Sequence, residues 1–138
     1  KLGVELQVVD ARAPEQFETA FRALTQARAD ALLVAQESLF AIHFPRLADL
    51  SVKGRLPTIS GLDGYAKAGG LMNYSVNQAD SFRQVAGYVD RLLRGAIPAE
   101  LPVEQPTKFE FVINLKAAKQ IGLTIPPNVL ARADKVIR

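Results

Sequence analysis

The five-residue run from Ala31 to Ala35, ALLVA, constrains the fold of this chain more than any other feature. A continuous apolar run of this length is typical of a β-strand buried on both faces, in a sheet with helices on each side. Amphipathic segments with helical spacing flank the run at residues 14–28 and 41–53. We therefore expect an α/β fold, with an open, mostly parallel sheet and helices on both faces.

Further strands are expected from the same kind of pattern. Val4–Val9 predicts a strand that would complete a right-handed βαβ unit with the first helix and the ALLVA strand. Leu56–Ser60 and Leu71–Val76 predict two more strands, separated by the loop-rich segment 61–70, which has a possible helical turn at 65–68. Strands and helices thus alternate along the first half of the chain.

The clearest helix is expected at Gln78–Arg94, with Asn77 as its N-cap. Its apolar stripe consists of Phe82, Val85, Ala86, Val89, Leu92 and Leu93. Gly95–Pro106 contains three prolines, which predict an extended connector.

The C-terminal segment combines a strand with short helices. Lys108–Ile113 alternates in polarity and predicts a strand, and Asn114 should cap a helix at Leu115–Ile121. Gly122 suits the left-handed position that ends this helix, and Pro126-Pro127 begins another.

Composition excludes several classes of function. At 138 residues the chain can form one domain with a sizeable core, and no apolar stretch approaches the roughly 18 residues that cross a bilayer. The absence of cysteine excludes disulfides, thiol catalysis and cysteine-based metal sites. A net charge of +3 with scattered basic residues gives no nucleic-acid patch.

No catalytic, metal or cofactor site is expected. His43 is the only histidine and has no second ligand at metal spacing, so a packing or surface role is favoured. The serines lie in no GxSxG elbow, and Gly61-Leu62-Asp63-Gly64 lacks the lysine and spacing of a phosphate loop.

Candidate ligand-binding residues follow from topology. In an open parallel sheet, ligands bind beyond the carboxyl ends of the strands, where loops converge. This rule selects three loops, which are Gln36-Glu37-Ser38, Gly61-Leu62-Asp63 and Asn73-Tyr74-Ser75.

Neutral groups dominate these loops. Gln36, Ser38 and Asn73 offer hydrogen-bond donors and acceptors, and Tyr74 offers a stacking face with a hydroxyl group. Each also has a plain structural interpretation; Ser38, for example, suits a helix cap.

Charged ligand groups have candidate partners as well. Backbone N–H groups near Gly61 are candidates to bind a carboxylate, and Glu37 or Asp63 to bind an ammonium group. The alternative is that these acids are only solvated, as acids in surface loops commonly are.

A family resemblance covers essentially the whole chain. The run PVEQPTKFEFVINLKAAKQIGLTIPP, with GGLMNYSVNQADSFRQVAGYVDRLLRG before it and NVLARADKVI after it, resembles the C-terminal part of ABC-importer substrate-binding proteins. The family is the one related to tryptophan-binding components, with the type I periplasmic-binding-protein fold. The resemblance implies a Rossmann-like lobe and a binding protein without enzymatic activity.

The resemblance also implies a cellular location and a function. The protein would be periplasmic or otherwise extracytoplasmic, and would deliver an amino acid or a related aromatic or aliphatic acid to an ABC permease. The alternative is a sensory or regulatory module of the same fold; an enzyme is a third option that would need a nucleophile–base pair. Because no signal peptide precedes the first strand, we expect a C-terminal fragment.

Three regions follow from the resemblance. Residues 1–76 would form the ligand-binding C-terminal lobe with a βαβαβ core, and residues 107–138 would close it with a strand and the last helices. Residues 77–106 would pack on an N-terminal lobe. Without that lobe, we expect the 78–94 helix to pair with a second copy, forming a homodimer; the alternative is a monomer whose helix folds back on its own sheet.

One position departs from the family pattern. Amino-acid-binding relatives often carry an acidic residue where this chain has Leu62. An apolar side chain there favours a less polar ligand.

Overall fold

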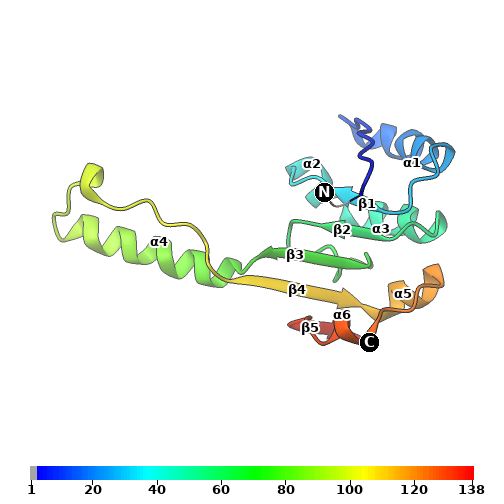
Figure 1. Ribbon diagram of the computed structural model, residues 1–138. Helices are drawn as coiled ribbons and strands as arrows, with labels where there is room; N and C mark the ends of the chain where they lie inside the picture. The colour runs from blue at the N-terminus through cyan, green and yellow to red at the C-terminus, as the bar shows by residue number, and fades with distance from the viewer. Residues whose placement is uncertain (1–2) are drawn as a thin grey trace.

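One five-stranded sheet organises the structure, a computed structural model that describes residues 3–138 (Figure 1). The strands lie in chain order: β1 (Leu32–Val34), β2 (Thr58–Ser60), β3 (Met72–Val76), β4 (Phe109–Asn114) and β5 (Lys135–Ile137). The pairs β1–β2, β2–β3 and β4–β5 are parallel, and β3–β4 is antiparallel. The expectation of a mostly parallel α/β sheet is confirmed.

One face of the sheet is covered by the helices on either side of β1. The 3₁₀ turn η1 (Pro14–Gln16) leads into α1 (Phe17–Gln26), and α2 (Ser38–Ile42) and α3 (Phe44–Lys53) follow β1. Their apolar residues form one cluster with strand and loop residues: Phe17, Phe21, Leu24, Val34, Phe44, Leu47, Ala48, Leu56 and Tyr65. This cluster fixes the positions of the loops that follow β1 and β2.

Several boundaries differ from the sequence prediction. The helix expected at 14–28 is shorter, and the one expected at 41–53 is two helices that meet at His43. Pro45 lies in the first turn of α3, where its missing N–H costs no intrahelical hydrogen bond.

The strand predicted at Val4–Val9 is wrong for this chain. Residues 3–12 have no regular secondary structure, and the side chains of Val4, Leu6 and Val8 are all more than three-quarters exposed. The βαβ unit expected to begin with this strand is therefore not formed. A strand needs a hydrogen-bonded neighbour, and none of the described strands pairs with this segment.

The C-terminal elements match the prediction as far as α6, but the chain ends in β5, where no strand was predicted. Asn114 caps α5 (Leu115–Ile121) by accepting a hydrogen bond from the N–H of Ala117 at 3.1 Å, and Gly122 ends the helix at a φ of +76°. The helix α6 (Pro127–Leu130) begins at the second of two prolines. A second apolar cluster joins α5 to the sheet through Leu71, Ile113, Ala117, Ala118, Ile121 and Ile125.

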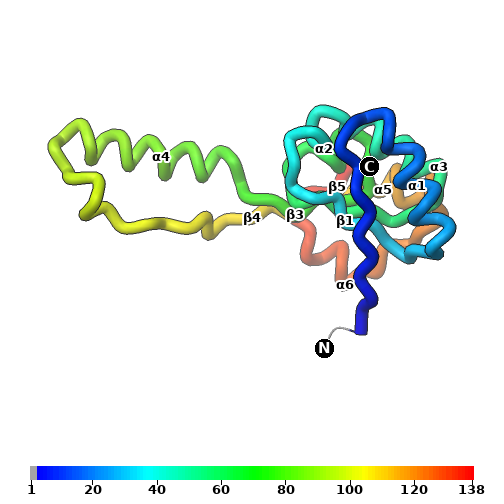
Figure 2. The backbone as a smooth tube through the Cα atoms, turned by 90° about the horizontal axis from the view of Figure 1, so that it is seen from above, coloured from blue at the N-terminus to red at the C-terminus, as the bar shows by residue number. Residues whose placement is uncertain are grey.

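Residues 77–106 form an arm that projects from the sheet (Figures 1 and 2). It consists of α4 (Gln78–Leu93), a turn at η2 (Pro98–Glu100), and an extended return to β4. No side chain of α4 is buried, and the predicted stripe is exposed, with Phe82 at 70% and Leu93 at 83%. The alternative in which this helix folds back on its own sheet is therefore wrong.

The return segment packs along α4. The Tyr88 hydroxyl group donates a hydrogen bond to the carbonyl oxygen of Pro102, and the guanidinium group of Arg91 pairs with Glu104 at 3.3 Å. The arm is thus a helix with one extended segment of the chain packed against it.

The two links between arm and sheet lie side by side. The N–H of Asn77 donates to the carbonyl oxygen of Lys108 at 2.9 Å, and the Lys108 ammonium group pairs with Asp80 at 2.7 Å. Asn77 also caps α4 as predicted, because its Oδ1 accepts a hydrogen bond from the N–H of Asp80 at 3.0 Å. We call these contacts the neck. In residues 3–138, no helix combines the length and apolar character needed to span a membrane.

Candidate functional site

The loops that follow β1 and β2 meet at the carboxyl edge of the sheet. Val34 and Ser60 are partners in the parallel β1–β2 pair, so Gln36 and Gly61 leave the sheet at the same level. A side-chain carbon added to Gly61 would lie 2.3 Å from Nε2 of Gln36. The side chain of Gln36 therefore lies directly over Gly61. Any side chain at position 61 would displace it.

The remainder of the second loop satisfies its own polar groups. The Ser60 hydroxyl group accepts a hydrogen bond from the N–H of Leu62 at 3.1 Å, and Asp63 accepts one from Gly64 at 2.7 Å. Asp63 also pairs with Lys67 at 3.3 Å, which offsets its charge. Leu62 packs partly buried against the first core cluster, a position that suits its apolar side chain.

Two buried asparagines hold the middle of this loop. Asn73, the partner of Ser60 in the β2–β3 pair, accepts a hydrogen bond from the N–H of Ala66 at 3.3 Å. Asn114 donates to the carbonyl oxygen of the same residue at 2.9 Å. We call this arrangement the Ala66 clamp. Asn73 also donates to Ser75 at 3.3 Å, so its amide group is occupied within the chain.

Tyr65 anchors the loop to the first apolar cluster. Its ring is fully buried, and its hydroxyl group lies 3.0 Å from that of Ser51, which also accepts a hydrogen bond from Thr58. Burial raises the pKa of the Tyr65 hydroxyl group. Gly70 lies against the ring, where a side-chain carbon would come within 2.2 Å. The loop at 61–70 is thus fixed at several points beneath the candidate site.

The first loop is more open. Glu37 occupies the N-cap position of α2 and Ser38 is the first residue of that helix; both side chains are exposed. Ser38 therefore does not provide the cap that the structural interpretation suggested, and its side chain is exposed at this edge of the sheet.

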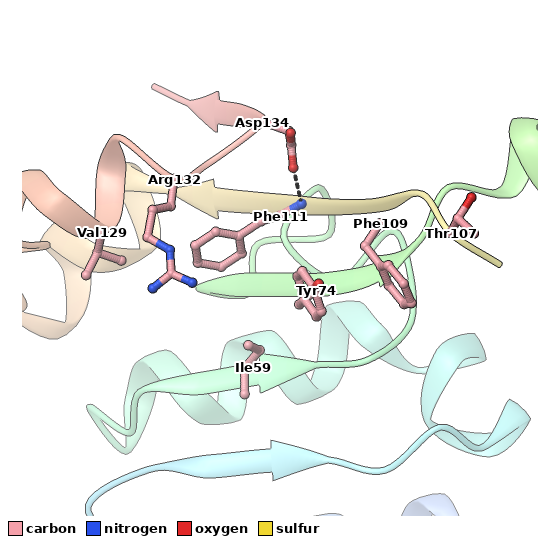
Figure 3. A pocket seen from close by; sticks show the side chains of 8 residues that line it. All are labelled: Ile59, Tyr74, Thr107, Phe109, Phe111, Val129, Arg132 and Asp134. Carbon is pink, nitrogen blue, oxygen red and sulfur yellow. Dashed lines mark hydrogen bonds between the residues drawn. The ribbon is translucent and has the colours of Figure 1, made fainter. Parts of the chain in front are cut away.

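Tyr74 lies on the opposite face of the sheet from Asn73. Its ring stacks on Phe109, with centroids 5.3 Å apart and planes 9° apart, and meets Phe111 edge-on. Figure 3 shows these rings with Ile59 and Arg132 around an open depression of about 730 Å³. Tyr74 already has aromatic partners within the chain, a role that its sequence position did not reveal.

The remaining candidates for chemistry are structural. His43 packs edge-on against Phe17, with ring centroids 5.7 Å apart. No group of three or more His, Asp or Glu side chains in residues 3–138 is arranged to hold a metal ion.

Comparison with known proteins decides the family. The family described as ABC transporter substrate binding protein matches residues 1–137. The chain belongs to this family. Family members bind solutes and are not enzymes, and the resemblance drawn from the C-terminal motifs is confirmed. No curated protein matches the chain.

Solved structures of other proteins share this fold. A conserved domain protein from Vibrio cholerae is 25% identical, with a TM-score of 0.86 over 97% of this chain and 45% of its own. An ABC domain from Streptococcus pneumoniae in complex with L-Trp is 26% identical, with a TM-score of 0.85 over 98% of this chain and 45% of its own. The open, ligand-free structure of CD0873, a substrate-binding protein with adhesive properties from Clostridium difficile, is 19% identical, has a TM-score of 0.67 over 89% of this chain and 41% of its own, and supports the fold alone. The chain spans less than half the length of each of these proteins.

Proposed function

We propose that this chain is the C-terminal part of an extracytoplasmic solute-binding protein that captures a small molecule and delivers it to an ABC permease. The observation that carries the proposal is family membership over residues 1–137, together with the convergence of Gln36 and Gly61 at the sheet edge. A similar solved structure holds L-Trp, so an amino acid or a related aromatic or aliphatic acid is the ligand class we favour. Its cleft would lie between this lobe and a second one.

Direct ligand contacts from this lobe are proposed at 36–38 and 61–63. Of the predicted group 73–75, Asn73 and Ser75 are buried within β3, and Tyr74 lies on the opposite face of the sheet. Gln36 and Ser38 are placed to donate or accept hydrogen bonds directly, whereas Asn73 would act indirectly by holding Ala66. Asp63 is paired with Lys67 and Leu62 is apolar, so the second loop offers little to an ammonium group. An aromatic or aliphatic carboxylic acid therefore suits the second loop better than an α-amino acid, and the exposed Glu37 of the first loop is the remaining candidate partner for an ammonium group.

Calorimetric titration of the longer protein tests the ligand class. L-Tryptophan and indole-3-propionate, which lacks the ammonium group, are the matched pair of probes. We expect indole-3-propionate to bind at least as tightly. Binding of L-tryptophan alone would refute the interpretation of Leu62 while leaving the receptor function intact, and turnover of either probe would refute the receptor function.

A double-mutant cycle tests the contact between the two loops. Gly61→Ala should displace Gln36, so it should weaken binding about as much as Gln36→Ala, by a typical hydrogen-bond contribution of about 0.5–1.5 kcal/mol. The double variant should lose no more than either single variant. Full additivity would show that the two residues act independently, and unchanged affinity in all three would place the ligand elsewhere.

We also propose that residues 77–106 pack on the second lobe, while residues 1–76 and 107–138 build the first. The superposition on the Vibrio cholerae structure has a TM-score of 0.86 and covers 97% of this chain. Residues 77–106 are a large share of the chain, so the superposed part must include most of the arm. This supports a similar projection of the arm in that protein, which is more than twice as long. The exposed apolar stripe of α4 is the surface that such a lobe would cover.

In the 138-residue chain alone, we propose that a second copy covers this stripe. Leu93→Glu should then shift a dimer to monomer in sedimentation at micromolar concentration, whereas Arg83→Glu on the same exposed helix should not. A wild-type chain that sediments as a monomer would refute the homodimer.

A further inference from the structure

The N-terminal end of α1 lies beside the first candidate loop. Phe17, the first residue of α1, packs against Phe40 of α2 with ring centroids 6.0 Å apart, and α2 begins directly after Gln36-Glu37. Glu18, the next residue of α1, pairs with Arg46 in the first turn of α3 at 2.8 Å. Figures 1 and 2 also show the start of α1 close to α2. The segment that leads into α1 therefore lies at the carboxyl edge of β1.

Residues 10–13, which form this segment, have a fixed backbone. Ala11 packs against the first core cluster, and the N–H of Arg12 donates a hydrogen bond to Oε1 of Gln16 at 2.7 Å. The side chain of Arg12 is 87% exposed, and its partner Asp10 lies 3.9 Å away and is also largely exposed. An ion pair with this distance and exposure contributes little to stability. The guanidinium group of Arg12 is therefore available to another anion.

Two other cations near this edge have closer carboxylate partners. Lys67 pairs with Asp63 at 3.3 Å, and Arg46 donates to both carboxylate oxygens of Glu18 at 2.8 Å. The positive charge of Arg12 is thus the least neutralised of the three.

The second loop has few donors left for a carboxylate group. The N–H of Leu62 donates to the Ser60 hydroxyl group at 3.1 Å, and the N–H of Gly64 donates to Asp63 at 2.7 Å. Two of the backbone N–H groups near Gly61 are therefore occupied within the chain. Because an unpaired buried charge is costly, a carboxylic acid enclosed in a cleft needs a partner that these groups do not supply.

We propose that Arg12 binds the carboxylate group of the ligand and is a specificity-determining residue of this lobe. The proposal rests on the proposed function and adds to it the side chain that distinguishes an acid from a neutral analogue. The planar guanidinium group forms two parallel hydrogen bonds with a carboxylate group, a geometry that lysine does not reproduce.

Calorimetric titration of the longer protein with two pairs of probes tests the role of Arg12. Indole-3-propionate and L-tryptophan carry the carboxylate group, and indole-3-propionamide and L-tryptophanamide carry an amide group in its place. The wild type should prefer each acid that it binds over the matching amide by at least about tenfold, the contribution of hydrogen bonds to a charged group. Arg12→Gln should remove most of this preference by weakening the acid, and Arg12→Lys should give an intermediate affinity.

Two control variants separate the charge of Arg12 from changes in net charge and in the segment itself. Arg22→Gln removes the same charge from an exposed position further along α1, so it should leave the preference unchanged. Asp10→Asn alters the same segment but removes a negative charge, so it should not weaken binding of the acid.

The outcomes distinguish this proposal from the receptor function. Equal wild-type affinities for acid and amide, or acid binding unaffected by Arg12→Gln, would overturn the role of Arg12 and leave the receptor function intact. An equal loss in Arg22→Gln, or weaker acid binding in Asp10→Asn, would also overturn it. Binding of none of the four probes would overturn both the ligand class and the role of Arg12.

Discussion

Asn114 has two separate tasks, and replacing it should separate their contributions. Its Oδ1 caps α5 through Ala117, and its Nδ2 satisfies the carbonyl oxygen of Ala66, 48 residues away in the sequence. Loss of a cap costs about 1 kcal/mol. A buried carbonyl group left without a partner costs about 1–3 kcal/mol. Asn114→Ala should therefore lower the free energy of unfolding by about 2–4 kcal/mol.

Two further variants isolate the Ala66 clamp. Asn114→Ser keeps a capping oxygen, but its shorter side chain does not reach the carbonyl oxygen of Ala66, so this variant should be more stable than the alanine variant by about 1 kcal/mol. Asn77→Ala is the matched control, because Asn77 caps α4 in the same way, at 3.0 Å, without holding Ala66. It should lose only the cap.

Urea unfolding followed by circular dichroism gives the required free energies, provided that the slope with urea is unchanged between variants. Asn114→Ser as stable as the wild type would refute the clamp. Equal losses for Asn114→Ala and Asn77→Ala would refute it as well.

The remaining predictions concern the loop beneath the site and the neck. Because burial raises the pKa of Tyr65, the contribution of this residue to the free energy of unfolding should be constant up to about pH 10 and fall above it, where the unfolded state ionises first. Tyr65→Phe should reduce the alkaline fall in urea titrations at several pH values. Gly70→Ala should lower the free energy of unfolding by about 1–3 kcal/mol, because the added carbon meets the Tyr65 ring at 2.2 Å, and a wild-type midpoint would contradict that close approach. Lys108→Ala removes the ion pair with Asp80 and should cost about 0.5–1 kcal/mol, a loss that should shrink in high salt; a loss independent of salt would show that packing is responsible.

Features that depend only on neighbouring residues were predicted correctly from the sequence. The caps at Asn77 and Asn114 and the left-handed Gly122 depend on residues three or four positions away, so the sequence alone predicts them. The division of the 41–53 helix at His43 was missed because the apolar spacing continues across the break. Boundaries set by packing are not visible in such spacing.

Long-range relations could not be predicted in the same way. The Val4–Val9 pattern is that of a strand, yet a strand forms only when a partner supplies hydrogen bonds, and the described chain supplies none there. The hydrogen bond between Asn73 and Ala66 and the stacking of Tyr74 on Phe109 depend on the strand register. The loop positions predicted from the sequence do not specify this register. The candidate ligand residues therefore stay predictions, with their geometry now defined.

The neck determines how the arm is free to move. Both links run through one two-stranded ribbon, β3 and β4, and are joined where they leave the sheet by the hydrogen bond between Asn77 and Lys108. A ribbon of this kind bends easily perpendicular to its own plane, but bending within the plane would stretch one strand and compress the other against fixed hydrogen bonds. Any body attached to the arm would thus swing along a single arc, and the direction of that arc is already fixed by the plane of β3 and β4.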